Sequence, residues 1–101
     1  MANLLFVCTN SKHRSVTAAK MLSGVHETRF AGLAPTCENP VTEELVKWAD
    51  KVYCFEDRHK RKLRKRFGVR ASNLGVPDEY DYNDPSLREE LTYRFGNLGL
   101  M

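Results

Sequence analysis

The sequence predicts an α/β fold: a single-domain three-layer sandwich with a four-stranded parallel sheet. Short apolar runs alternate along the chain with segments whose apolar residues recur at helical spacing, the pattern of parallel strands joined by covering helices. The chain has 101 residues, of which 42% are hydrophobic and 29% charged, enough for one core and too few for a second. We therefore expect one domain spanning residues 1–101.

The first strand and the first helix are predicted at residues 3–8 and 15–24. The run from Leu4 to Val7 is continuously apolar, as in a strand buried on both faces. Ser15 is a favourable N-cap and Gly24 a favourable helix end. The inward-facing positions of this helix would be Ala18, Met21, Leu22 and Val25.

A second strand is predicted at residues 27–32, and a second helix begins at Asn39-Pro40. Asparagine is a good N-cap, and proline is favoured at the first helical position. The third strand follows at residues 51–55. The buried stripe expected for the second helix is Val41, Leu45, Trp48 and Ala49.

A basic helix then extends to about Phe67, and residues 71–76 form the fourth strand. The pair Asp84-Pro85 repeats the cap-then-proline signal and predicts the last helix. Its inward-facing residues are Leu87, Leu91 and Phe95.

The junction between the first strand and helix carries the strongest functional signal: Cys8, five loop residues, then Arg14 and Ser15. A sharp turn there points backbone N–H groups inward, and the helix adds its own unpaired N–H groups and positive dipole end. Thiolates are stabilised by helix N-termini and nearby cations. The pattern predicts a Cys-x5-Arg loop that binds a phosphate or sulfate ion beside a nucleophilic Cys8. The alternative is a small buried cysteine at a strand end.

The sequence resembles the low-molecular-weight protein tyrosine phosphatases, whose signature is Cys-x5-Arg-Ser directly after an N-terminal strand. The resemblance extends to residues 29–32, 51–55 and 76–78. It implies a phosphatase that hydrolyses aryl phosphate monoesters, above all protein phosphotyrosine, through a phosphocysteine intermediate. No metal or other cofactor is expected. Partners would be a phosphorylated protein or a small aryl phosphate.

Three catalytic residues are expected: Cys8 as nucleophile, Arg14 as phosphate clamp and Asp78 as general acid. In an open parallel sheet the carboxyl ends of the strands share one edge, so Glu56, Asp57 and Asp78 should reach the thiol's side. Asp78 also matches the position of the family's catalytic aspartate. Asp84 is the alternative acid because it keeps the family's Asp-Pro pair, although a helix cap explains that pair.

The loop departs from the family pattern of glycine, asparagine, a hydrophobic residue and often cysteine. We expect Asn10 to take the left-handed conformation of the glycine, and Ser11 to brace the loop. His13 stands where many members of the family have the cysteine that forms a protective disulfide with the nucleophile, so that disulfide would be absent. We expect His13 to be exposed at the rim of the pocket. Ser15 should donate its hydroxyl to the thiolate. The residues expected to bind substrate are Thr9, Asn10, Ser11, Lys12, His13, Ser15 and Tyr80.

Tyr80 and Tyr82 either wall the pocket or merely pack. The basic run at residues 58–66 is expected to be mainly a solvated helix face, but it could bind nucleic acid or anionic lipid, or dock an acidic phosphoprotein segment. Cys37 could be a resolving thiol in arsenate-reductase-like chemistry. Two other functions stay open: a phosphate-binding or phosphocysteine carrier domain, and a nucleic-acid-binding adaptor on this fold.

Cysteine usage and hydropathy set the expected compartment. The chain has three cysteines, an odd number without metal-ligand spacing, which favours a reducing cytoplasm. No apolar run approaches the roughly 18 residues that span a membrane, so no membrane partner is expected. A net charge of +3 favours anionic substrates without requiring nucleic acid.

Overall fold

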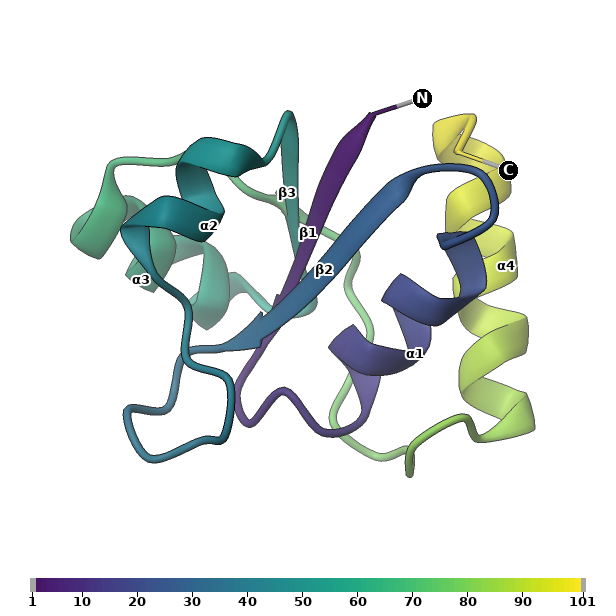
Figure 1. Cartoon of the computed structure of the whole chain (residues 1–101). Coiled ribbons are helices and arrows are strands. Elements are labelled where there is room, and N and C mark those ends of the chain that lie inside the picture. Colours follow the sequence, from purple (N-terminus) through teal and green to yellow (C-terminus); the bar gives the residue numbers. More distant parts are fainter. Residues whose placement is uncertain (1, 101) are drawn as a thin grey trace.

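The computed structural model describes residues 2–100 and contains one four-stranded parallel sheet with strand order β2-β1-β3-β4 (Figure 1). In chain order the elements are β1 (Asn3–Cys8), α1 (Arg14–Leu22), β2 (Glu27–Gly32), α2 (Glu43–Trp48), β3 (Lys51–Cys54), α3 (Asp57–Phe67), β4 (Ser72–Asn73) and α4 (Pro85–Leu98). The predicted α/β class and the four-stranded parallel sheet are confirmed.

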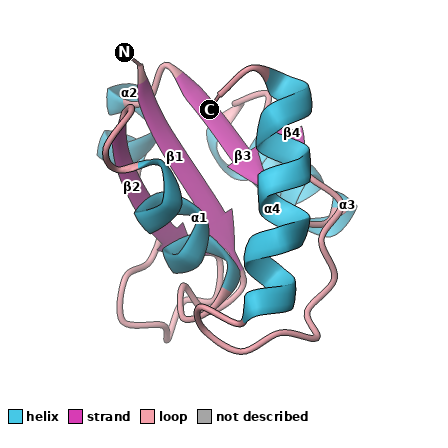
Figure 2. Cartoon of the chain, turned by 90° about the vertical axis from the view of Figure 1, so that its right-hand side faces the viewer, coloured by secondary structure: helices cyan, strands magenta, loops and turns pink. Residues whose placement is uncertain are grey.

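Helices cover both faces of the sheet, which gives three layers (Figures 1 and 2). Leu4 and Phe6 of β1 face the side of α1 and α4, whereas Leu5 and Val7 face the side of α2 and α3. All four side chains are fully buried, as expected for a central strand with a continuous apolar run. Among residues 2–100, no helix is long and apolar enough to cross a membrane.

The strand register brings the functional loops to one edge. Cys8 lies opposite Gly32 of β2, and Val7 lies opposite Cys54 of β3. Because all the strands are parallel, their carboxyl ends open on the same side. The segments that follow β1, β2, β3 and β4 therefore meet at this edge.

Several elements agree closely with the sequence-based prediction. β1 and β2 have the predicted bounds, and β3 is one residue shorter. Asp84 caps α4, because its carboxylate accepts the backbone N–H of Ser86 at 2.8 Å. The three residues predicted to face inward from α4 are fully buried: Leu87, Leu91 and Phe95.

The start predicted for the second helix is wrong. The N–H of Gly32 donates to the carbonyl of Asn39, and the N–H of Val41 donates to the carbonyl of Gly32, both at 2.9 Å. These bonds hold residues 39–41 extended beside the end of β2, with Pro40 in a bridge to Gly32. The helix begins only at Glu43, with Thr42 as its N-cap.

The expected buried stripe of this helix is correspondingly weaker. Val41 is buried but precedes α2. Leu45, Trp48 and Ala49 are half-buried and pack against the core from its margin.

Two other local signals were overridden. Ser15 is not the N-cap of α1: the helix begins at Arg14 with His13 as its cap residue, and Ser15 turns inward. The helix ends at Leu22, so Val25 is 49% exposed rather than inward-facing.

The fourth strand is shorter than predicted. Only Ser72 and Asn73 form β4, although the N–H groups of Leu74 and Val76 still donate to the carbonyls of Cys54 and Phe55. Gly75 has a left-handed backbone with φ of 69°, which interrupts the pleated conformation.

Phe95 anchors α4 on the sheet: it is fully buried, and its ring lies 5.8 Å from that of Phe6. We expect Phe95→Ala to lower the free energy of unfolding by about 3 to 5 kcal/mol, because it removes buried apolar surface and leaves a cavity. The control is Tyr93→Ala in the same helix, where the side chain is 65% exposed. Urea unfolding measures both, and equal losses would contradict this account of α4.

Candidate active site

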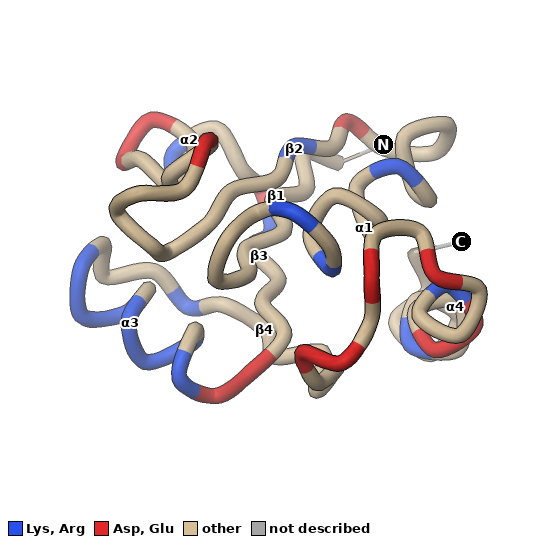
Figure 3. The backbone as a smooth tube through the Cα atoms, turned by 90° about the horizontal axis from the view of Figure 1, so that it is seen from below, with Lys and Arg blue, Asp and Glu red and all other residues tan. Residues whose placement is uncertain are grey.

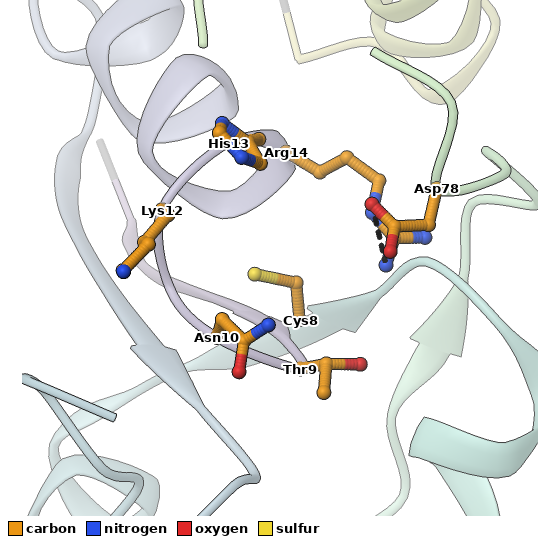
Figure 4. Close-up of a pocket in the computed structure, with 7 residues that line it drawn as sticks. All are labelled: Cys8, Thr9, Asn10, Lys12, His13, Arg14 and Asp78. Atoms are coloured by element: carbon orange, nitrogen blue, oxygen red, sulfur yellow. Dashed lines mark ion pairs between the residues drawn. The ribbon is translucent and has the colours of Figure 1, made fainter. Parts of the chain in front are cut away.

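Residues 9–13 arch around the sulfur of Cys8 between β1 and α1 (Figure 4). The backbone N–H of Ser11 donates to Cys8 Sγ at 3.2 Å, and Ser15 Oγ lies 3.0 Å from the same sulfur. The loop opens into a cavity of about 160 Å³. Its lining residues are Cys8, Thr9, Asn10, Lys12, His13, Arg14 and Asp78.

The left-handed residue of this loop is Ser11, with φ of 54°, and not Asn10 as expected. This conformation directs the Ser11 N–H to the Cys8 sulfur. Within residues 2–100 the Ser11 hydroxyl makes no hydrogen bond, so Ser11 braces the loop through its backbone. The pattern of the sequence could not decide between two adjacent polar residues, since both asparagine and serine occur in turns.

Gly32 allows the end of β2 to approach the loop. A Cβ atom at Gly32 would lie 2.7 Å from the carbonyl oxygen of Thr9 and 3.0 Å from the nitrogen of Ser11. The next two residues hold the loop, because the N–H groups of Leu33 and Ala34 donate to the carbonyls of Cys8 and Thr9, both at 2.9 Å. The loop is therefore pinned by backbone bonds from a neighbouring strand.

Arg14 is only 2% exposed, and its guanidinium is anchored on one side. Nη1 donates to the carboxylate of Glu56 at 2.9 Å and to the carbonyl of Val76 at 2.8 Å. Nη2 lies 3.9 Å from the carboxylate of Asp78, the ion pair drawn in Figure 4. This anchoring fixes a cation at the wall of the cavity.

Glu56 is the principal carboxylate partner of Arg14, a role that the sequence pattern does not predict. Hydrogen bonds from Arg58 and Arg14 lower its pKa to about 2, so the carboxylate is ionised at neutral pH. Its position directly after β3, at the functional edge of the sheet, is the only signal in the sequence for this role.

His59 is a second residue that the sequence did not single out. It is 2% exposed; its Nδ1 accepts the N–H of Phe55 at 3.4 Å, and its Nε2 lies 3.0 Å from Thr9 Oγ1. Burial, together with the charge of Arg14, lowers its pKa to about 4, so the ring is neutral at pH 7. The Thr9 hydroxyl is thus committed to α3 by His59 and by Arg58, whose Nη2 donates to it at 3.2 Å.

The two candidate acids have different surroundings. Asp78 lines the cavity with a half-exposed carboxylate, whereas Asp84 caps α4. Neither candidate tyrosine lines the cavity: Tyr80 packs against the core on the side of α1 and α4, and the ring of Tyr82 lies 5.3 Å from the ammonium of Lys20. The two tyrosines therefore do not form the aromatic wall that the sequence suggested.

His13 and the remaining cysteines complete the surroundings. His13 is half-buried rather than exposed, and within residues 2–100 its buried Nδ1 has no hydrogen-bond partner. Cys54 is buried in β3, and burial raises the pKa of its thiol to about 11, which leaves it protonated. Cys37 is half-buried beside Gly32.

The buried neutral His59 predicts acid sensitivity. Since folding lowers its pKa from 6.5 to about 4, the unfolded chain takes up the proton first as the pH falls. The free energy of unfolding should drop by about 2 kcal/mol between pH 7 and pH 5 from this group alone. Urea titrations of the wild type and His59→Gln at both pH values measure it. A variant that loses as much stability as the wild type would contradict the assignment.

The pair between Arg14 and Glu56 predicts a cost for neutralising the carboxylate. Glu56→Gln leaves a buried guanidinium without its anion, and we expect the free energy of unfolding to fall by about 2 to 4 kcal/mol. Glu79→Gln, at the exposed position after Asp78, removes the same charge and is the control. It should change the free energy of unfolding little. Urea unfolding at pH 7 compares them; similar values for both variants would show that the pair is not needed to hold Arg14.

No known family model matches the chain, and no curated protein matches it in sequence. Solved structures do match. The YwlE arginine phosphatase from Geobacillus stearothermophilus is 21% identical, with a TM-score of 0.76 over 97% of this chain and 90% of that chain. A low-molecular-weight protein tyrosine phosphatase from T. tengcongensis is 20% identical, with a TM-score of 0.69 over 99% and 97%.

The tyrosine phosphatase Wzb from Escherichia coli K30, solved in complex with phosphate, is 16% identical, with a TM-score of 0.72 over 97% of this chain and 96% of that chain. The fold implied by the Cys-x5-Arg-Ser signature is confirmed by these similarities. The chain has the fold of the low-molecular-weight protein tyrosine phosphatases.

Proposed function

We propose that this protein is a cysteine-dependent phosphatase that hydrolyses phosphate monoesters. The observation that carries the proposal is one juxtaposition: the Cys8 sulfur, the Arg14 guanidinium and the Asp78 carboxylate border the same small cavity. A nucleophile, a cation and a proton donor are the groups that metal-free transfer of a phosphoryl group to sulfur uses. The shared fold of solved phosphatases adds support.

In the first step, Cys8 attacks phosphorus as a thiolate. The Ser11 N–H and the Ser15 hydroxyl both lie within hydrogen-bond distance of the sulfur and can stabilise its negative charge. Arg14 and the loop N–H groups hold the phosphoryl oxygens, over which charge spreads in the transition state. A sulfur–phosphorus bond forms as the ester bond to the leaving oxygen breaks.

Asp78 completes the cycle. Protonated, it gives its proton to the leaving oxygen; as a carboxylate, it then takes a proton from the water that attacks phosphocysteine. The sulfur–phosphorus bond breaks, and phosphate and the thiolate are released, with the Ser15 hydroxyl donating to the departing sulfur. Half-exposure suits Asp78 to this task, because both leaving group and water must reach it.

The proposed substrates are aryl phosphates, foremost phosphotyrosine in proteins, as the family signature implies. A cavity of about 160 Å³ has room for the phosphoryl group and for part of the aryl group that follows it. A carrier domain that keeps the phosphoryl group on cysteine would need neither Arg14 at this spacing nor a leaving-group acid, which is why hydrolysis is the favoured function.

The test is hydrolysis of a small aryl phosphate at mildly acidic pH. Cys8→Ser should abolish turnover, and Asp78→Asn should lower kcat by about 10²- to 10⁴-fold, because the leaving oxygen then departs unprotonated. Asp84→Asn is the matched control and should retain activity. Urea unfolding checks that each variant is folded.

Turnover that persists in Cys8→Ser would overturn the mechanism. A loss in Asp84→Asn without one in Asp78→Asn would move the acid to Asp84. No turnover by the wild type, despite saturable binding of inorganic phosphate, would make the protein a phosphate-binding or carrier domain.

A further inference from the structure

The positive charge of the chain is concentrated on one helix. Seven of the 16 Lys and Arg residues lie within the 11 residues of α3, beside a single acidic residue, Asp57. The other 90 residues carry nine Lys or Arg and twelve Asp or Glu. Figure 3 shows these cations gathered along α3. The modest net charge of +3 therefore conceals a basic surface on a chain that is otherwise acidic.

Three of these cations share one flank of α3. Arg58, Lys62 and Arg66 are spaced at i, i+4 and i+8, which places them in a row beside the buried residues His59 and Leu63. We call this row the α3 stripe. At 1.5 Å per residue it extends about 12 Å, the length of three or four residues of an extended peptide.

Both ends of the α3 stripe contact segments that hold the catalytic loop. Arg58 Nη2 donates to Thr9 Oγ1 at 3.2 Å, and Arg66 Nη1 donates to the carbonyl of Leu33 at 3.3 Å. Leu33 in turn donates its N–H to the carbonyl of Cys8. The stripe therefore reaches the pocket lining at Thr9 and continues to Leu33, just after β2. Lys60 and Arg64 lie on the opposite flank of the helix.

The segment that leads from β4 to α4 carries the opposite charge. Between residues 78 and 84 there are four acidic residues and no Lys or Arg: Asp78, Glu79, Asp81 and Asp84. In Figure 3 the red positions between β4 and α4 lie on one side of β4, and the blue positions of α3 lie on the other. An anionic chain whose phosphoryl group occupies the pocket is therefore repelled by the acidic segment and attracted by the α3 stripe.

We propose that the α3 stripe docks acidic residues that flank the phosphorylated side chain of a protein substrate. The inference rests on the proposed phosphatase function and adds its substrate class. Lys12, which is exposed and lines the cavity, adds a further cation at the pocket. Aspartate and glutamate side chains a few residues from the phosphorylated position would pair with Lys62 and Arg66.

An acidic polypeptide fits this surface better than a nucleic acid. Proteins that bind single strands combine cations with aromatic side chains on which bases stack. Among residues 2–100 the large exposed hydrophobic side chains are Val25, Tyr82, Tyr93 and Leu98, none of them on α3. The stripe offers charge alone, which suits carboxylates.

The test compares two phosphotyrosine peptides of equal length, one with Asp and Glu flanking the phosphorylated residue and one with Asn and Gln at the same positions. We expect the wild type to favour the acidic peptide by about three- to tenfold in kcat/KM at low ionic strength, and to lose this preference at 0.5 M salt. Lys62→Glu should abolish or reverse it. Lys60→Glu carries the same change of charge on the opposite flank and should preserve it.

Each outcome is decisive. Equal kcat/KM for the two peptides, or equal effects of Lys62→Glu and Lys60→Glu, would overturn the proposal. A competition experiment gives a further contrary outcome. The proposal would be overturned if single-stranded RNA displaced the labelled acidic peptide at a lower concentration than unlabelled acidic peptide does. A small aryl phosphate, assayed in parallel, reports the proposed function separately. If it is not hydrolysed, fluorescence anisotropy of the labelled peptides on the Cys8→Ser variant measures the same preference without turnover.

Discussion

The buried guanidinium of Arg14 is the constraint on which the site depends. A cation that is 2% exposed must be paired, and its partners come from distant parts of the chain: the carboxylate of Glu56 after β3 and the carbonyl of Val76 after β4. These bonds tie the start of α1 to the two strands beyond the central one. The cation is consequently held at the cavity wall without a ligand, which is the preorganised charge that the proposed phosphoryl transfer requires.

The rest of the loop around Cys8 is held by backbone hydrogen bonds and neutral side chains. Gly32 lets β2 approach the loop, the N–H groups after it hold the loop's carbonyls, and neutral His59 binds the Thr9 hydroxyl. Among residues 2–100, Arg14 is the one side chain beside Cys8 that is both charged and buried. Such an arrangement suits an anionic ligand, because its charge is met by one fixed cation and by N–H dipoles, without competing carboxylates in the loop itself.

The charged residues outside this loop are distributed unevenly over the surface. The Cys-x5-Arg loop lies between a basic helix and an acidic segment, so charge is unevenly distributed around the pocket although the net charge is small. Helix α3 contributes both to the loop and to the charged surface. Its first turn supplies His59 and Arg58, which bind Thr9, and its outward flanks carry the excess of cations. One element thereby supports the geometry of the site and carries the surface on which we propose that acidic substrates dock.

The sequence by itself determined β1, α4 and the position of the Cys-x5-Arg loop, because a continuous apolar run and a cap-then-proline signal act over a few neighbouring residues. The bounds of β2 were also predicted correctly, although its residues do not form such a run. Only the tertiary structure decided the rest. Asn39-Pro40 predicted a helix start, but backbone hydrogen bonds with Gly32 hold this segment extended. Ser15 was predicted to cap α1, but its hydroxyl lies beside the sulfur of Cys8. The pairing of Arg14 with Glu56 joins residues 42 positions apart, and that of Thr9 with His59 joins residues 50 positions apart. Contacts of this range leave no local pattern in a chain, since they arise only when the strands assemble.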